Sequence, residues 1–262
     1  MAKVIGIYNQ KGGTGKTSSA INIAAFLEES GYDVLAIDID VQGNYTDAML
    51  HAENKTQLKT VVDLITNEGV EVKDTSYPVY LVMKSKSQPK RIHIDMIPAP
   101  QTETRKLFCD PLALQKALDK VSKEYDYIII DFPPERPYAD TQKAEYNLVT
   151  LALCCANEII TPCTTDIDSI NGFVTLTTHI NLIKQMYNPY LYKTSFYING
   201  FSGYKIEEEF LDSCKTLPSY SGICIPNSGL LKTSRAIERP LAWFNSKSQI
   251  AQSYKALTEY IK

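Results

Sequence analysis

The stretch that decides the fold is VIGIYNQKGGTGKTSSAINIAAFL, residues 4–27. Residues 4–8 are apolar or small and predict a short buried strand, and residues 15–30 predict a helix that ends before Gly31. Between them, three glycines allow backbone N–H groups to converge on phosphate oxygens, and the helix N-terminus adds its positive dipole end. A strand, a glycine-rich loop and a helix in this order predict a phosphate-binding loop.

The loop departs from the usual pattern G-x-x-x-x-G-K-[ST] at one position. Gln10 stands where the pattern has glycine, and a second lysine, Lys11, follows it. Lys16 is expected to reach the β- and γ-phosphates, and the Thr17 hydroxyl is expected to bind Mg²⁺. A glycine-rich turn binds nothing in many folds, but the sequence GKT after a strand favours a nucleotide. The expected nucleotide contacts are Gly12, Gly13, Thr14, Gly15, Lys16, Thr17 and Ser18.

Composition narrows the class of protein. The chain has 262 residues, of which 44% are hydrophobic, and a formal net charge of −3, which argues against a protein that coats nucleic acid with its whole surface. The six cysteines form no C-x-x-C pair and no zinc-finger spacing with histidine, so buried reduced thiols are predicted. No signal peptide and no apolar run of roughly 18 residues is present, and we therefore expect a cytoplasmic protein without a membrane span.

Short apolar runs alternate with segments of helical period, which is typical of a parallel sheet covered by helices. We predict one α/β domain over residues 1–262, with a mostly parallel central sheet of seven or eight strands and helices on both faces. The expected strands are 4–8, 34–38, 80–83, 92–97, 127–131, 158–162, 195–199 and 222–225. The expected helices are 15–30, one from 110 with Pro111 in its first turn, 166–186 and 249–261. Apart from 80–83, residues 63–89 are polar and weakly periodic and predict a surface excursion.

Two further segments carry carboxylates at the ends of predicted strands. In YDYIIIDFPP, residues 125–134, Asp131 follows three isoleucines, which is where a Walker B acid meets the Mg²⁺ shell. In VLAIDIDVQGN, residues 34–44, Asp38 and Asp40 are two apart, and strand alternation would send both to the same side. The alternative is an ordinary solvated strand end.

These segments together resemble the ParA/MinD family of deviant Walker A ATPases, and within it the short Soj-like ParA partition proteins. The resemblance includes NEIITPCTTDIDSINGF (157–173) and continues through IPNSGLLKTSRAIERPLAWFNSKSQIAQSYKAL (225–257). It implies ATP and Mg²⁺ as cofactors, with Lys11 acting across a dimer on the partner's phosphates. It also implies that Asp40 positions the attacking water and that Asp38 and Asp131 lie near Mg²⁺. The positions that match the family's adenine contacts are Asn199, Pro226 and Asn227.

The resemblance further implies an ATP-bound homodimer, a centromere-binding partner of the ParB kind, non-specific DNA binding and association with the nucleoid. Two departures matter: Val41 replaces a usual proline, and Glu207, Glu208 and Glu209 follow Lys205 where the family commonly has arginines. The predicted DNA contacts are Lys193, Lys205, Lys232, Arg235, Arg239 and Lys247. The short segment ahead of the first strand leaves no room for a helix-turn-helix, so sequence-specific DNA binding by this chain is not expected.

Three other interpretations remain. A MinD-like membrane-cycling ATPase would need a basic amphipathic helix at residues 249–261, but packing against the sheet explains the apolar stripe there better. An iron–sulfur carrier or reductase would need cysteines bridging two subunits, whereas Cys154 and Cys155 fit a helix core. The third is an ATPase that positions a protein cargo, such as conjugation, secretion or division machinery, without binding DNA, and the acidic run favours it.

Overall fold

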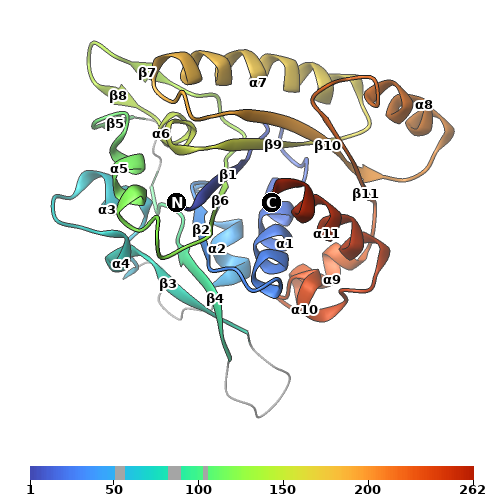
Figure 1. The fold of residues 1–262 in the computed structure, drawn as a ribbon, viewed down its shortest axis with the longest axis horizontal. Helices are drawn as coiled ribbons and strands as arrows, with labels where there is room; N and C mark the ends of the chain where they lie inside the picture. The colour runs from blue at the N-terminus through green and yellow to red at the C-terminus, as the bar shows by residue number, and fades with distance from the viewer. Residues whose placement is uncertain (51–56, 82–89, 103–105) are drawn as a thin grey trace.

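The computed structural model describes residues 1–50, 57–81, 90–102 and 106–262, and it contains a central sheet of eight strands (Figure 1). The strands are β1 (Lys3–Ile7), β2 (Val34–Asp38), β3 (Tyr77–Leu81), β4 (Lys90–Ile97), β6 (Tyr127–Asp131), β9 (Glu158–Cys163), β10 (Lys193–Phe201) and β11 (Tyr220–Pro226). They lie in the order β11-β10-β9-β1-β6-β2-β4-β3, and every neighbouring pair is parallel except β3 and β4. The predicted α/β fold with a mostly parallel sheet is confirmed.

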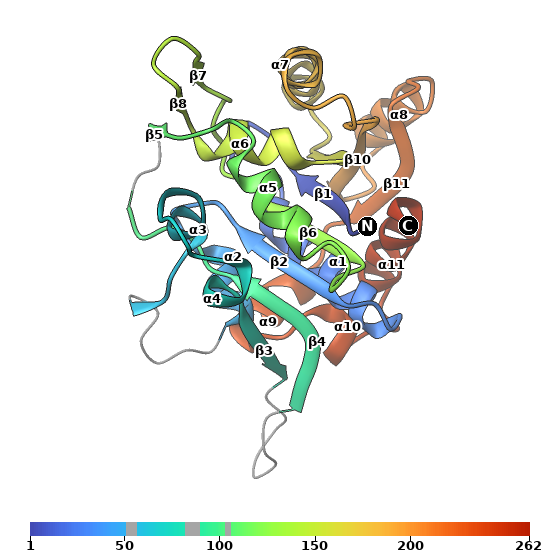
Figure 2. The same cartoon turned by 60° about the vertical axis from the view of Figure 1, so that its left-hand side comes forward.

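Helices cover both faces of the sheet. One face packs against α3 (Val61–Thr66), α5 (Ala113–Lys120), α6 (Leu148–Cys155) and α7 (Ile167–Met186). The other packs against α1 (Lys16–Glu29), α2 (Asn44–Met49), α10 (Leu241–Phe244) and α11 (Gln249–Ile261). Figure 2 shows α5 and α6 in front of the sheet and α1 behind it. The remaining helices are α4 (Val72–Thr75), α8 (Lys205–Cys214) and α9 (Leu230–Ala236).

The long periodic helices match the sequence prediction closely. Helix α1 ends before Gly31, whose φ of +90° lets its N–H donate to Glu28 O at 2.8 Å and close the last turn. The apolar stripe of α11 is fully or almost fully buried against α1 and β11, which confirms packing as its role. In the described ranges, no helix combines the length and apolar character that a membrane crossing requires.

Four short elements, α3, α4, β3 and α5, differ from the prediction. Residues 61–81 are not a plain surface excursion, because α3 and α4 bury Val61, Leu64 and Val72, and β3 begins at Tyr77 rather than at residue 80. Residues 82–83 of the predicted strand lie outside the described residues. Helix α5 begins at Ala113 rather than Asp110, because the Asp110 carboxylate accepts a hydrogen bond from Leu112 N at 2.9 Å and forms a turn instead.

A second, antiparallel sheet of three two-residue strands was not predicted. It has the order β5-β8-β7, with β5 (Leu107–Phe108), β8 (Glu145–Tyr146) and β7 (Ala139–Asp140). Strands of two residues are too short to show a period of two in the sequence.

The arrangement of the parallel strands determines where a ligand can bind. Strand β1 lies between β9 and β6, and its chain connection to β2 skips over β6, so the strand order reverses at β1. Ligands of open parallel sheets bind outside the carboxyl ends of the strands at such a point. The segments after β1, β2, β6, β9 and β10 all leave this same edge.

Candidate functional site

The predicted phosphate loop connects β1 to α1 in a left-handed backbone conformation that glycine adopts without strain. Gly13 has a φ of +74° and Gly15, the N-cap of α1, has a φ of +95°. A Cβ at Gly15 would come within 2.2 Å of Asn199 Nδ2. Asn199 in turn donates a hydrogen bond from Nδ2 to Thr14 O at 2.7 Å. Only glycine fits here, because a side chain would meet both strain and a clash.

Lys16 is the first residue of α1, and its ammonium group folds back into the loop. The residue is buried, with 7% exposure, and Nζ donates to Lys11 O at 3.1 Å. Burial lowers the pKa of Lys16, although Asp131 and Asp40 act in the opposite direction. A buried cation beside glycine N–H groups at a helix N-terminus is suited to an anion such as a phosphate.

Asp38 and Asp131 end adjacent strands and are directly paired in the register of β2 and β6. Asp38 is fully buried and accepts hydrogen bonds from Thr46 N, Thr46 Oγ1 and Asp40 N at 2.9–3.0 Å. Burial raises the pKa of Asp38 to about 7, despite these hydrogen bonds. Thr46 of α2 therefore occupies one carboxylate oxygen of Asp38, and the place of Asp38 near Mg²⁺ stays a prediction.

Asp131 is buried at 1% exposure, and neither carboxylate oxygen accepts a hydrogen bond of ordinary geometry from the described residues. Burial, and next the charge of Asp38, raise the pKa of Asp131 well above its usual range. The Thr17 hydroxyl and the Lys16 ammonium favour the charged form but offset only part of this rise. Two buried oxygens that accept no hydrogen bond of ordinary geometry from the described residues fit an oxygen-preferring cation such as Mg²⁺, held directly or through water.

No group of three or more His, Cys, Asp or Glu side chains that could hold a metal ion occurs in the described part of the chain. Such a group is not required for Mg²⁺ in a phosphate-loop site, because the ion is bound by one or two protein groups together with substrate phosphates and water. Thr17 and Asp131 are two residues whose oxygens could take part in that mode of binding, and their assignment to Mg²⁺ stays a prediction.

The loop and Asp40 line one cavity of 260 Å³. The Asp40 side chain accepts a hydrogen bond from Gln42 N at 2.9 Å, which folds the segment after β2 into a turn. Asn44, Pro134 and Arg235 complete the lining, and sequence reasoning had assigned the first two no role. Among the predicted nucleotide contacts, this cavity is lined by Gly12, Gly13, Gly15, Lys16, Thr17 and Ser18. Thr14 is buried at 1% exposure and serves the loop through its backbone.

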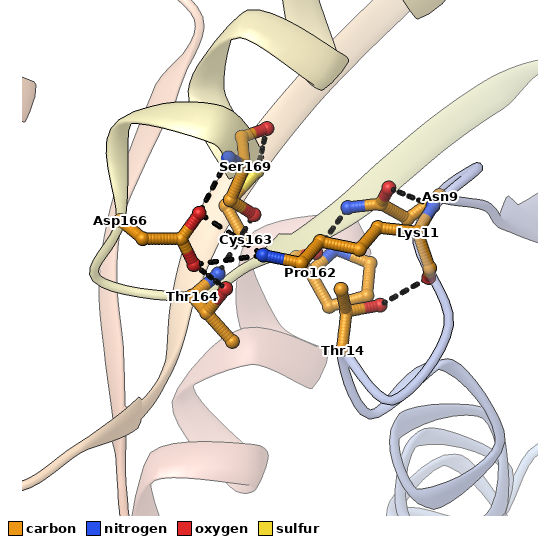
Figure 3. A network of polar contacts seen from close by, with 8 residues as sticks. All are labelled: Asn9, Lys11, Thr14, Pro162, Cys163, Thr164, Asp166 and Ser169. Atoms are coloured by element: carbon orange, nitrogen blue, oxygen red, sulfur yellow. Dashed lines mark hydrogen bonds and ion pairs between the residues drawn. The ribbon is translucent and has the colours of Figure 1, made fainter.

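Lys11 does not enter this cavity with its ammonium group but forms an ion pair with Asp166 (Figure 3). Lys11 Nζ lies 3.0 Å from both oxygens of Asp166, which also caps α7 by accepting from Ser169 N at 2.8 Å. Burial opposes ionisation of Asp166, but hydrogen bonds from Thr164 and Lys11 leave its pKa below the usual range. The sequence analysis missed Asp166, although its place directly after β9, next to β1, was a usable signal.

The predicted adenine contacts are divided between two places. Asn199 is engaged with the phosphate loop, as described above. Pro226 and Asn227 line a separate cavity of 120 Å³ together with Leu230 and Gln249. Their assignment to adenine stays a prediction.

The structure separates the six predicted DNA contacts. Lys193 lies at the start of β10, 2.9 Å from the buried Glu158 and 3.7 Å from the centre of the Tyr260 ring. Arg235 lines the phosphate cavity at the opposite edge of the sheet. Lys205, Lys232 and Lys247 are exposed on the surface, Arg239 is partly buried, and all six remain predictions as DNA contacts.

The first of the three adjacent glutamates has a structural role. The Glu207 carboxylate accepts hydrogen bonds from Ser202 N and Thr165 Oγ1, both at 2.8 Å, and from Tyr204 N at 3.3 Å. It therefore fixes the start of α8 to the loop that contains Asp166. Only Glu208 and Glu209 remain as exposed acids of the run.

The six cysteines are all free thiols. Cys154 and Cys155 are buried in α6, where burial raises the pKa of Cys154 to about 12. Such thiols remain protonated and behave as core residues, as the sequence analysis expected.

Comparison with known proteins identifies relatives of the whole chain. Residues 2–193 match the family model described as an AAA domain. The chromosome partitioning protein ParA of Myxococcus xanthus is 28% identical over 268 residues, covering 98% of this chain and 87% of that protein. The sporulation initiation inhibitor protein Soj of Bacillus subtilis is 31% identical over 192 residues, covering 72% of this chain and 68% of that protein. A putative plasmid partition protein from Borrelia burgdorferi, solved with bound AMPPNP, has a TM-score of 0.76 at 21% identity, covering 99% of this chain and 98% of that one.

The family match covers residues 2–193, which is most of the chain, and the match to ParA of Myxococcus xanthus extends over 98% of it. The fold, the phosphate loop and the sequence comparisons agree with one another. The chain belongs to the ParA/MinD family of P-loop ATPases.

Proposed function

We propose that this chain, as one domain over residues 1–262, is a ParA-like ATPase that binds Mg-ATP, dimerises and acts in plasmid or chromosome partitioning. The observation that carries the proposal is the single cavity of 260 Å³ shared by the phosphate loop and Asp40. The glycines and Lys16 in its lining suit an anion, and the same lining includes the Asp40 carboxylate, which has access to solvent. That is the pairing which attack of water on a terminal phosphate requires.

In this proposal the protein holds the phosphates mainly through backbone N–H groups of Gly12–Ser18 and the ammonium of Lys16. Bound Mg²⁺ would neutralise developing charge on the phosphates. Thr17 and Asp131 would hold it, with Asp38 behind Asp131 as a second carboxylate. The Pro226–Asn227 cavity is the place proposed for adenine.

Asp40 orients the attacking water, or accepts its proton, from the rim of the cavity. Lys11 supplies a second cation to the partner's phosphates once it leaves Asp166. Such a cation delivered by another subunit lowers the barrier because phosphoryl transfer concentrates charge on the phosphate oxygens. Slow hydrolysis by the monomer and faster hydrolysis in the dimer follow from this arrangement.

Closure of the dimer is the proposed switch. ATP shifts the chain toward the closed dimer only if the closed state binds it better than the open state does. The closed dimer would bind non-specific DNA at the nucleoid, and a ParB-type partner would supply sequence specificity and stimulate hydrolysis.

Binding to non-specific duplex DNA at low and high salt tests the proposal. Four states should be compared: no nucleotide, ADP, ATP, and ATP with the Asp40→Ala variant. Salt-sensitive binding that appears only with ATP and strengthens in the variant is the expected result. ATP-driven dimerisation without any DNA binding would overturn the partition role.

That second outcome would favour an ATPase that positions a protein cargo. Helix α8 supports this alternative, since Glu208 and Glu209 are exposed there and Ile206 is 76% exposed. An acidic and apolar surface attracts a protein more readily than a phosphate backbone.

A further inference from the structure

Arg235 is the cationic side chain, besides Lys16, that lines the phosphate cavity in the described part of the chain. It comes from the last turn of α9, about 220 residues after the loop in sequence, and shares the cavity with Ser18, Asp40 and Asn44. Sequence reasoning grouped it with DNA contacts because an exposed arginine after the sheet carries no sign of its partner. Only the fold shows that it faces the loop.

The position of α9 relative to the phosphate loop is fixed by hydrogen bonds. Asn22 of α1 donates from Nδ2 to Ser18 O at 2.7 Å and accepts at Oδ1 from Leu241 N at 2.9 Å. The segment between α9 and α10 is held in turn by Ser234, which is 7% exposed and bonds to the backbone of Arg239. The segment that follows α9 is therefore tied to α1 through Asn22, and Ser234 ties the last turn of α9 to that segment, which supports the position of Arg235.

The guanidinium group is not committed to another acid. No carboxylate of the described residues forms an ion pair with Arg235, and Asp40 in the same cavity bonds to Gln42 N instead. Lys193 and Lys11, by contrast, are held by Glu158 and Asp166. An uncommitted arginine on the rim of an anion cavity can form bidentate, charge-assisted hydrogen bonds to phosphate oxygens.

We propose that Arg235 binds the phosphate chain of the nucleotide held by its own subunit, as a second cation beside Lys16. This inference rests on the proposed nucleotide-binding function. It removes Arg235 from the DNA-binding surface and makes the C-terminal part of the chain a contributor to the phosphate site.

The test measures equilibrium affinity for Mg-ATP and Mg-ADP in wild type and in Arg235→Ala, Arg235→Lys and Arg235→Gln. Loss of charge-assisted bonds to phosphate predicts that Arg235→Ala and Arg235→Gln bind nucleotide roughly tenfold to a hundredfold more weakly. Arg235→Lys should recover part of the affinity, since it keeps the charge but loses the planar fork. Lys255→Ala is the matched control, because Lys255 is an exposed cation on α11 away from the cavity, and it should bind like wild type.

Wild-type affinity for both nucleotides in Arg235→Ala would overturn the inference, as would a variant that binds ATP normally but loses DNA binding. The thermal midpoint without nucleotide should be the same in wild type and Arg235→Gln, which separates a lost contact from misfolding. If wild type itself binds neither nucleotide, or if Lys16→Ala binds as well as wild type, the proposed function has failed rather than this inference alone.

Discussion

Lys11 Nζ and the two carboxylate oxygens of Asp166 lie 3.0 Å apart, although the residues are separated by 155 positions in sequence. Both side chains are nearly half exposed, at 47% and 40%. The pair joins the phosphate loop to the N-terminus of α7, and it holds within the monomer the lysine that we propose to act on a partner (Figure 3).

Asp166→Asn should make ATP-driven dimerisation easier. Asparagine keeps the N-cap of α7 but removes the charge that retains Lys11. Because the pair is half exposed, it contributes less than about 1 kcal/mol in each protomer. Closure of a symmetric dimer breaks two such pairs, so the dimer dissociation constant with ATP should fall by at most about thirtyfold. Analytical ultracentrifugation with ATP measures the dimer dissociation constant. Lys11→Ala is the comparison, because this variant should fail to form the closed dimer. Weaker dimerisation of Asp166→Asn would show that Asp166 belongs to the closed state instead.

Asp40→Ala should bind ATP normally and hydrolyse it at least about a hundredfold more slowly, because only the water-orienting carboxylate is lost. The variant should accumulate as closed dimer with ATP. Single-turnover hydrolysis together with size-exclusion chromatography checks both effects. Hydrolysis at the wild-type rate would show that another group positions the water.

Asn199 and Gly15 should behave as a coupled pair. Asn199→Ala removes the hydrogen bond to Thr14 O and should lower the free energy of unfolding by about 1 kcal/mol, with weaker nucleotide binding. Gly15→Ala should abolish tight binding, because its Cβ meets Asn199 Nδ2 and its φ is positive. Combining Gly15→Ala with Asn199→Ala removes the clash with Asn199 Nδ2 but keeps the positive φ at residue 15. Titration calorimetry with nucleotide should therefore find that the double variant binds more tightly than Gly15→Ala but more weakly than wild type. Full recovery would mean that the clash alone requires glycine.

Asp131→Asn should stabilise the nucleotide-free protein at neutral pH while abolishing Mg²⁺-dependent hydrolysis. Burial raises the pKa of Asp38 to about 7 and that of Asp131 as well, against about 4 in an unfolded chain. The folded protein therefore holds these protons more tightly than the unfolded chain does. The stability that protonation of Asp38 contributes is present below about pH 4 and is lost as pH rises to about 7, and the contribution of Asp131 is lost in the same direction.

Removing the second acid should raise the free energy of unfolding at pH 7.5 by about 1–3 kcal/mol and flatten its dependence on pH. Urea unfolding at pH 5 and pH 7.5, without nucleotide, measures this change. If Asp131→Asn is less stable than wild type at pH 7.5, the Asp131 carboxylate stabilises the nucleotide-free fold, and its proposed role as a cation ligand that costs stability is wrong.

The sequence alone determined the fold and the centre of the site. Strand β1, the phosphate loop and helix α1 follow one another in the chain, so local contacts specify their geometry. The helical period of α11 and the apolar runs of β2 and β6 predicted these three elements at their observed bounds. Parallel pairing then brought Asp38 and Asp131 side by side, since both end their strands at the same edge. The two-residue strands of the small sheet and the start of α5 were missed because they depend on turns and side-chain bonds without a period.

Tertiary structure decided the partners of the long polar side chains. Lys11 with Asp166, Asn199 with the loop backbone, and Arg235 on the cavity rim each join segments more than 150 residues apart. A flexible cation or amide can satisfy its hydrogen bonds in many directions, so its residue type does not specify which group it meets. Only the order of the strands, and the helices packed on them, selects one partner from the many that chemistry allows.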